Sequence, residues 1–442
     1  MTSLSLGRPF HSATGGIPRR RPQRLATRLR ISNSSLHLPN KQFKKAYTSV
    51  LIVPTGVGAA IGGYAGDALP VARALSTVVD CLISHPNVLN AASLYWPMPN
   101  ILYVEGYALD RFAEGLWALQ PVHQNKVGLV LDAGIEKDLR IRHLQVVDAA
   151  RASLGLPVVE YTVTDTPLQV EKWINSKSGQ STGRIQHSDS LLRAVGSLIK
   201  RSGVTAVAVV ARFPDDDSDD IDDYRQGMDA LLSFAINSDH STACSSAFKL
   251  YSEPWVSLDL LAGVEAVISH LVVKNYGIPC AHAPALLPLP LGPSLCPKSA
   301  AEEIGYTFLP CVLAGLSTAP QYLVRNSESS DKDCILASDV DSVILPIDAC
   351  GGDGALAFAS GKTSRSLLIA VEENETVLRD TPDKLGINAV KVSNYWEAIG
   401  VVAAHKAGID PNSLRRDRIK NIQHAFSAPS NGYAFSGAES FL

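Results

Sequence analysis

The chain has 442 residues, of which 46% are hydrophobic and 19% are charged, and its formal net charge is -3. This composition excludes a chain that is disordered throughout, a collagen-like or heptad repeat and a disulfide scaffold. The first 45 residues carry ten basic residues and no acid, so all 43 acidic residues fall in an acidic body, which argues against a general nucleic-acid binder.

Residues 1–45 have the composition of an organelle transit peptide. They are rich in Arg, Ser and Thr and lack the continuous apolar stretch of a secretory signal. Abundant hydroxyl residues, and arginines without a helical stripe, favour a plastid over a mitochondrion. We therefore expect a chloroplast protein of the stroma; the alternative is a basic tail that binds a polyanion.

The body opens with a strand, a glycine-rich loop and a helix. Thr48–Pro54 is an apolar, β-branched run typical of a buried strand. A glycine-rich turn follows at Thr55–Asp67. Ala68–Ile83 has helical spacing of its apolar residues, and Pro70 fits the first turn of a helix.

The same alternation continues along the chain. Further strands are predicted at Val127–Asp132, Val158–Val163, Thr205–Ala211, Asp341–Ile347, Ser366–Val371 and Ala389–Val392, and helices at Arg142–Leu154, Asp189–Arg201, Leu261–Val273 and Tyr395–Ala407, the last closed by Gly408. Strands alternating with amphipathic helices predict an α/β protein with a largely parallel sheet flanked by helices, either in one body or in two α/β lobes. We divide the chain into an N-terminal α/β region (46–227), an atypical segment (228–258) and a C-terminal α/β region (259–442).

The central segment does not follow this pattern. Ser233–Ser257 has seven serines and no clear period. It is either a surface loop or an insertion, such as intronic sequence translated from an imperfect gene model. Just upstream, Asp215–Asp223 holds seven aspartates in nine residues, which fits a divalent-cation site or, more commonly, a solvated loop.

No membrane span, zinc ribbon or disulfide framework is predicted. Three long stretches lack formal charge, but glycine and proline interrupt each of them: Ala46–Gly66, Asn275–Pro297 and Ile304–Val324. The chain has seven cysteines, and no two of them have CxxC spacing. Reduced thiols in a soluble protein are the expectation.

The first glycine loop is a candidate anion site. Glycines after a strand let the backbone approach an anion, and the next helix adds its free N–H groups. The candidate residues are Gly56, Gly58, Gly62 and Gly63, with Arg212 at a later strand end as a clamp. A dinucleotide fingerprint would need glycine at position 61, where Ile61 stands. The alternative is a tight turn that requires small residues.

Candidate acid–base and metal-binding residues follow other predicted elements. Asp348 and Asp353 lie in a second glycine loop, where they serve proton transfer or metal binding, or simply cap helices. The Gly361–Thr363 triplet resembles the end of a phosphate-binding loop, but Leu356 replaces the glycine which that loop requires.

A third region offers histidines. His270 and His282, with Glu265 and Cys280, supply a potential metal set or nucleophile pair, or a structural histidine pair. Asp67, at the end of the first loop, is a further acid–base candidate. His85 and Glu105–Tyr107 are minor candidates because aromatics at this density usually belong to the core.

Several long strings resemble one family. They are IVPTGVGAAIGGYAGDALPVARAL (Ile52–Leu75), HPNVLNAASLYWPMPNILYVEGYALDRFA (His85–Ala113), VVARFPDD (Val209–Asp216), GVEAVISHLVV (Gly263–Val273), IPCAHAPAL (Ile278–Leu286), GYTFLPCVLAGLS (Gly305–Ser317) and ILPIDACGGDGALA (Ile344–Ala357). The chain resembles, over about residues 46 to 410, the uncharacterised domain-of-unknown-function family numbered 3326, shared by cyanobacteria and plant plastids. The resemblance implies a plastid protein of cyanobacterial ancestry and supplies no catalytic residues. Met228–Leu258 departs from the family pattern, which supports the insertion hypothesis.

The leading hypothesis is an enzyme acting on a small anionic, for example phosphorylated, metabolite. The glycines and Arg212 would bind the anion, and Asp67, His270, His282, Asp348 and Asp353 would supply acid–base or metal chemistry. The alternative is a non-catalytic plastid binding or assembly factor. The sequence leaves the reaction, the cofactor, the metal and the formation of a homo-oligomer open.

Overall fold

A computed structural model describes residues 45–63, 66–90, 94, 96–214, 261–286, 308–325, 333–361, 366–419 and 421–422. The described residues from 46 onward belong to one compact unit. The predicted transit peptide up to residue 44, the aspartate run 215–223 and the segment 228–258 lie outside the described residues.

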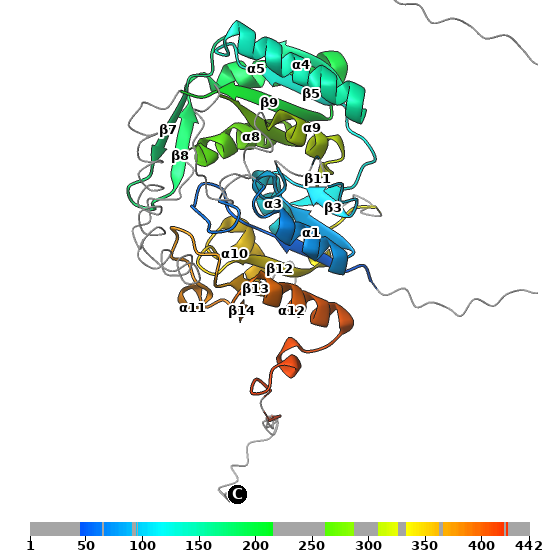
Figure 1. The fold of residues 1–442 in the computed structure, drawn as a ribbon, viewed down its shortest axis with the longest axis vertical. Coiled ribbons are helices and arrows are strands. Elements are labelled where there is room, and N and C mark those ends of the chain that lie inside the picture. Colours follow the sequence, from blue (N-terminus) through cyan, green and yellow to red (C-terminus); the bar gives the residue numbers. More distant parts are fainter. Residues whose placement is uncertain are drawn as a thin grey trace, which may run out of the picture. The chain divides into compact units, whose positions relative to one another are not determined.

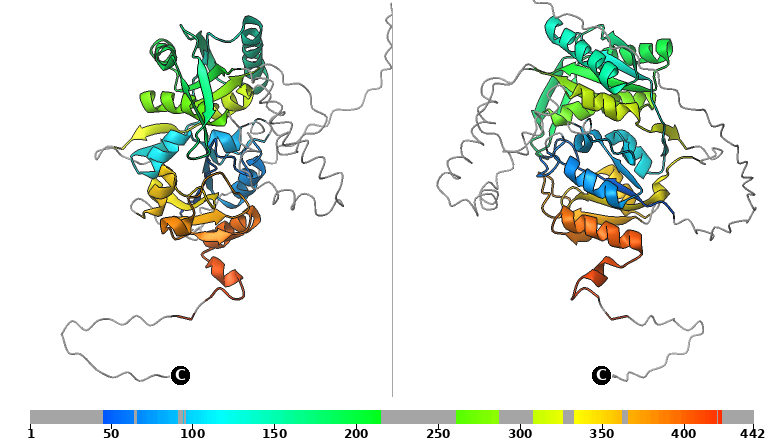
Figure 2. Two further views of the ribbon diagram at one scale, coloured as in Figure 1. Left: turned by 90° about the vertical axis from the view of Figure 1, so that its left-hand side faces the viewer. Right: turned by 45° about the vertical axis from the view of Figure 1, so that its right-hand side comes forward.

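One sheet combines strands from both ends of the chain. Its six parallel strands run in the order β14-β13-β12-β1-β2-β3, with β1 (Thr48–Leu51), β2 (Cys81–Ser84), β3 (Ile101–Tyr103), β12 (Val340–Pro346), β13 (Leu367–Val371) and β14 (Val390–Val392). Figures 1 and 2 show the blue N-terminal elements beside the gold and orange C-terminal ones. Strand β1 is buried along its whole length, as expected for a central parallel strand.

The middle of the chain forms a second parallel sheet. Its order is β10-β9-β5-β6, with β5 (Val127–Leu131), β6 (Val158–Val163), β9 (Ala206–Arg212) and β10 (Cys280–Ala285). Two antiparallel ribbons complete the described strands: β4 (Trp117–Gln120) with β11 (Gln321–Val324), and β7 (Val170–Ile174) with β8 (Ser181–Ile185). The predicted α/β class with largely parallel sheets is confirmed, and each sheet draws strands from both sequence regions.

Helices connect and cover the sheets. The described helices are α1 (Leu69–Val78), α2 (Pro86–Leu89), α3 (Gly106–Ala113), α4 (Lys137–Leu154), α5 (Ser188–Ser202), α8 (Ala262–Tyr276), α9 (Leu309–Ser317), α10 (Asp353–Ala359), α11 (Pro382–Leu385) and α12 (Tyr395–Ala407), with short 3-10 turns at Ala337–Asp339 and Pro411–Leu414. The predicted end of α12 is confirmed: Gly408 has φ 77°, a left-handed conformation that favours glycine.

The predicted helix over residues 68–83 is wrong at its C-terminal end. Helix α1 stops at Val78, and Cys81–Ser84 forms strand β2. The carboxylate of Asp80 accepts the N–H of Tyr47 at 2.8 Å, which turns the chain back beside β1. A four-residue apolar strand directly after a helix continues the helical spacing, so periodicity alone does not separate the two.

Two hydrophobic clusters each contain residues of both sheets. One includes Leu51 of β1, Leu129 of β5 and the buried face of α9. The other includes Ile83 of β2, Val207 of β9 and Phe112 of α3, together with apolar residues of α8. Helices α3 and α8 contact each other, and α3 also contacts α10. Polar side chains on these three helices therefore meet within a largely apolar surrounding.

Candidate functional site

The carboxyl edge of the six-stranded sheet carries the first residue of the candidate site. Ser84 at the end of β2 pairs with Tyr103 at the end of β3, so the chain after both strands emerges at the same edge. Ligands of open α/β sheets bind at this edge. Glu105 follows β3 there, and His85 follows β2.

Glu105 is fixed by hydrogen bonds and is nearly inaccessible. As the N-cap residue of α3, it accepts the N–H groups of Tyr107 and Ala108 through Oε2, at 2.9 and 3.3 Å. Its own N–H donates to the hydroxyl of Tyr322 at 3.2 Å. The side chain is 2% exposed. A buried carboxylate needs a compensating partner for its second oxygen.

His270 of α8 is that partner. Its Nδ1 pairs with Oε1 of Glu105, while 42% of the imidazole side chain remains exposed. The close approach requires a small residue after the cap, because a Cβ on Gly106 would lie 3.0 Å from Cε1 of His270. Burial lowers the pKa of His270, but the hydrogen bond and charge of Glu105 and the charge of Asp110 outweigh it, so the pKa is raised.

Asp110 adds a carboxyl group on the same helix. Burial raises its pKa to about 6, the N–H of Gly354 lowers it, and the charge of Asp353 raises it. Gly354 donates that N–H to Oδ1 of Asp110 at 2.9 Å, which ties α3 to the start of α10. The pKa values of the Asp110 carboxyl group and of the His270 imidazole are both raised, and the two groups can accept or donate protons.

Three aromatic rings flank the pair. Tyr107 lies 6.4 Å from the ring of His270 and makes an edge contact with Trp117, which stacks on Tyr322. The same Tyr322 receives the N–H of Glu105. Tyr107 thus lies against the imidazole of His270 and Tyr322 against the backbone of Glu105, and Trp117 lies between these two rings.

The structure brings together two of the residues predicted as catalytic. His270 and Asp353 both interact electrostatically with Asp110. The other three have different partners. Asp348 accepts the N–H and the hydroxyl of Thr376 at 3.0 and 2.9 Å. Asp67 accepts the N–H of Gly62, and His282 contacts Ser269 at 3.1 Å and Glu265 at 3.5 Å.

The first glycine loop lies against the start of α8 and the chain after β13. A Cβ on Gly56 would meet Ser181 and Gly263 at 2.6 and 3.0 Å. A Cβ on Gly63 would meet the carbonyl of Ala59. Gly56, Gly58 and Gly62 have positive φ. These glycines therefore meet a packing and conformational requirement, whatever they bind.

Part of the N–H surface proposed for an anion already has protein acceptors. The N–H of Ile61 donates to Asn374 at 2.8 Å, that of Ala60 donates to the carbonyl of Glu375, and that of Gly62 donates to Asp67. The guanidinium of Arg212 donates to the carboxylate of Glu136 at 3.0 Å, beside the four-stranded sheet. Among the described residues, the group of Glu105, His270 and Asp110 is therefore a stronger candidate for a site than this loop.

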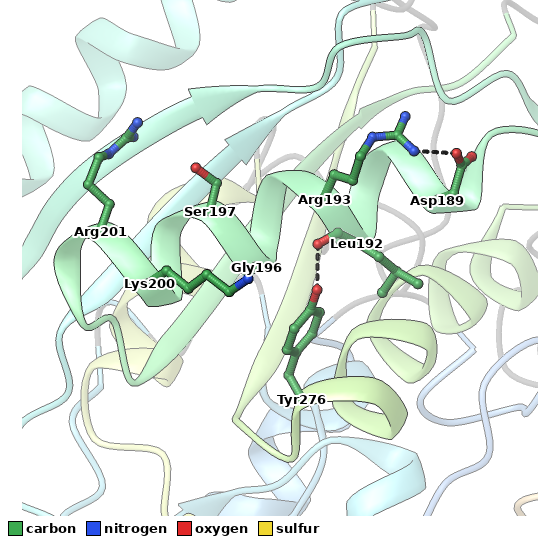
Figure 3. Close-up of a pocket in the computed structure, with 8 residues that line it drawn as sticks. All are labelled: Asp189, Leu192, Arg193, Gly196, Ser197, Lys200, Arg201 and Tyr276. Carbon is green, nitrogen blue, oxygen red and sulfur yellow. Dashed lines mark hydrogen bonds and ion pairs between the residues drawn. The ribbon is translucent and has the colours of Figure 1, made fainter.

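A surface hollow of about 760 Å³ lies along α5 and the end of α8. Figure 3 shows Arg193, Ser197, Lys200 and Arg201 on its α5 side and Tyr276 facing Leu192. Arg193 already pairs with Asp165 and Asp189, and Arg201 pairs with Glu160. Its arginines are thus neutralised by neighbouring carboxylates, and the hollow offers no group with the acid–base character of His270.

Sequence reasoning ranked Glu105 and His85 low and missed Asp110. Asp110 lies between Leu109 and Arg111 on a short helix, a pattern typical of a solvent-exposed face. Helix α10 covers that face, with Phe358 against Phe112 at 6.3 Å between ring centres. An acidic residue at the cap position of a helix directly after a strand is the signal that could have identified Glu105.

Neither a membrane-spanning helix nor a metal-binding cluster is found among the described residues. None of the described helices has the length and hydropathy needed to cross a membrane. Among those residues, no three His, Cys, Asp or Glu side chains gather as a metal ion would require.

Comparisons with known proteins place the chain among uncharacterised relatives. The family model described as "Protein of unknown function (DUF3326)" matches residues 48–235 and 235–415. An uncharacterized lipoprotein of Synechococcus sp. is 50% identical over 391 residues, which are 88% of this chain and 99% of the relative. No solved structure matches the chain.

Proposed function

Because the chain belongs to the DUF3326 family, whose description carries no activity, we propose a function from the geometry: an enzyme that transfers protons on a small metabolite. Glu105 and His270 form its acid–base pair, and Asp110 and Asp353 complete the site. The observation that carries the proposal is a half-exposed imidazole held by a carboxylate that is 2% exposed. An ordinary structural histidine does not need such a buried counter-charge.

The roles follow from the environments. Glu105 fixes the ring orientation of His270 and stabilises its charged form. His270 presents its remaining nitrogen as acid or base to a bound molecule. Asp110, with its pKa raised to about 6 by burial, remains partly protonated near neutral pH and serves as a second proton donor.

We keep the predicted negative charge of the metabolite in this proposal, but only for a group that binds at the glycine loop. There, the positive φ angles of Gly56 and Gly58 support a specialised backbone. Next to His270, the carboxyl groups of Glu105, Asp110 and Asp353 outnumber the imidazole, which disfavours a further negative charge. Any anionic group of the substrate therefore lies away from the reacting atoms.

The test is a substrate screen with the full chain. A panel of neutral, phosphorylated and carboxylated metabolites is incubated in D₂O and followed by proton NMR, which detects both conversion and deuterium incorporation. We expect at least one metabolite to react and H270N to lower its rate by about 100-fold or more. No reaction across the panel, or equal rates in H270N and wild type, contradicts the proposal.

The second candidate is a binding or assembly factor of the plastid. It is favoured by exposed apolar side chains at the β4–β11 ribbon, where Leu116 is 50% and Val324 is 63% exposed. Affinity capture from a plastid extract tests it. A stoichiometric partner that is lost in a V324D variant supports this function, provided that the variant remains folded.

We propose the plastid stroma as the location. The matched family region begins at residue 48, directly after the acid-free basic segment 1–45. The name "lipoprotein" describes the cyanobacterial relative.

A further inference from the structure

His85 is a buried histidine whose tautomer follows from one hydrogen bond. It comes directly after β2 and is 6% exposed. The N–H of Val53, just beyond β1, donates to Nε2 of His85 at 3.0 Å. A backbone N–H only donates, so Nε2 is an acceptor and carries no proton. The proton of the neutral ring therefore lies on Nδ1.

The neutral form is the stable one. Burial and, to a smaller extent, the charge of the neighbouring His270 lower the pKa of His85 to about 4. The charge of His270 acts on the ring of His85, and the charges of Glu105 and Asp110 act in turn on His270. At neutral pH, His85 is thus an uncharged donor through Nδ1, and the structure gives that N–H no acceptor among the described residues.

His85 follows β2 at the same edge of the sheet at which Glu105 follows β3. Strand β2 lies between β1 and β3, and the N–H of Val104 donates to the carbonyl of Ser84 at 2.8 Å. Nε2 of His85 points toward β1, because it accepts the N–H of Val53, which follows that strand. The two ring nitrogens of an imidazole point in widely different directions, so Nδ1 does not face Val53, and the charge of His270 acts on the same ring.

We propose that the site binds a neutral carbonyl group, whose oxygen accepts the Nδ1–H of His85. This inference rests on the proposed function and names its substrate class: an aldehyde, ketone, ester or amide. The donor excludes a cation at this point because a cation offers no lone pair. The carboxyl groups around His270 disfavour an anion. A neutral imidazole polarises a carbonyl oxygen without giving up its own proton, while the Glu105–His270 pair remains available for proton transfer.

The first experiment reads the tautomer. Long-range proton–nitrogen NMR of the full chain, labelled with ¹⁵N at its histidines, identifies His85 by comparison with H85Q. We expect the Nδ1–H form and no titration between pH 5 and 8. A proton on Nε2, or titration within this range, overturns the proposal. The tautomer is read on the wild type, and H85N gives the assignment where H85Q fails to fold.

The second experiment uses acetamide as a neutral carbonyl probe and acetate as its charged counterpart. We expect acetamide to shift the Nδ1–H signal of His85 and acetate at the same concentration to leave it unchanged. No response to acetamide, or an equal response to acetate, overturns the proposal.

Two variants separate the donor from the structural bond. In H85Q, the amide oxygen can still accept the N–H of Val53, but the Nδ1 donor is lost. In H85N, an amide N–H remains near Nδ1, and the bond to Val53 is lost. We expect acetamide to perturb the neighbouring His270 signal in the wild type and in H85N, but not in H85Q. The same perturbation in H85Q overturns the donor role.

The outcomes also separate this inference from the proposed function. A metabolite that reacts in a His270-dependent way, but equally fast in H85Q, refutes the inference and leaves the function standing. Acetamide binding through His85 without any reaction across the metabolite panel refutes the function and leaves the carbonyl site standing.

Discussion

At the scale of single residues, burial decides which ionisable groups acquire distinct properties. Glu105 and Glu114, nine residues later, carry the same carboxyl group, but Glu114 is partly exposed, whereas Glu105 is covered by its helix-cap hydrogen bonds and by an imidazole. Asp110 is partly buried because α10 contacts its helix, whereas Asp353 of α10 is exposed. The same side-chain chemistry therefore meets different surroundings within one cluster.

Asp110 makes a prediction about stability and pH. Its folded pKa of about 6 exceeds the value in the unfolded chain, so the folded state prefers the protonated form and loses stability as the pH rises through 6. D110N keeps an oxygen for the N–H of Gly354. We expect it nearly to match wild type at pH 4 and to be more stable at pH 8, by about 3 kcal/mol at most. Urea unfolding at the two pH values measures this.

The control is D148N, which changes an exposed aspartate of α4. It should alter stability little at either pH. A D110N variant that is less stable than wild type at pH 8 would show that the ionised carboxylate is stabilising and that its burial has been misjudged.

At the scale of elements, both α8 and the first glycine loop are positioned by close contact of their backbones with Ser181 of β8. The N–H of Gly263 donates to the hydroxyl of Ser181 at 3.1 Å, and the N–H of Ser181 donates to the carbonyl of Gly56 at 2.9 Å. A Cβ on Gly263 would lie 1.9 Å from the carbonyl oxygen of Ser181. Helix α8 thus begins where only glycine fits, and His270 follows two turns later.

Two glycine substitutions should have opposite effects. G263A forces a methyl group into the backbone of β8, and we expect it to destabilise the protein by about 2 kcal/mol or more. G400A places a methyl group in open space on the exposed side of α12, and we expect it to stabilise by about 0.5–1 kcal/mol through helix propensity. Thermal unfolding compares them. Equal effects would contradict the packing of α8 on β8.

The sequence predicts elements where local pattern and tertiary structure agree. The strand Val158–Val163 and the helix Tyr395–Ala407 have their predicted bounds. The helix over residues 68–83 fails because the turn at Asp80 depends on Tyr47, 33 residues away. Candidate residues follow the same rule: His270 is visible as a polar residue in an apolar helix, whereas Asp110 is identified only after α10, more than 240 residues later, is in place.

At the scale of the whole molecule, two sheets share continuous cores, so the site depends on both. Glu105 follows a strand of the six-stranded sheet, and His270 precedes a strand of the four-stranded one. The domain boundaries proposed from sequence, 46–227 and 259–442, would place these two residues in different regions. Expression of either region alone would therefore remove half of the acid–base pair.

The basic N-terminal segment carries a prediction of its own. We expect the full chain fused to a fluorescent protein to enter chloroplasts and the same fusion without residues 1–45 to remain outside. Microscopy of transfected leaf cells and a plastid import assay with protease treatment measure this. Import of both fusions, or of neither, contradicts the assignment of residues 1–45 as a transit peptide.

The most direct test of the acid–base site is the pH titration of His270 by NMR in wild type and in E105Q. We expect a pKa above the ordinary 6.5 in the wild type and a marked fall in E105Q, because removal of the Glu105 charge leaves burial, which lowers the pKa, opposed by the charge of Asp110 and the backbone hydrogen bond of Ala266. E114Q, which changes a carboxylate paired with Arg111, should leave the titration unchanged. An ordinary titration of His270 that is the same in all three proteins would contradict the account.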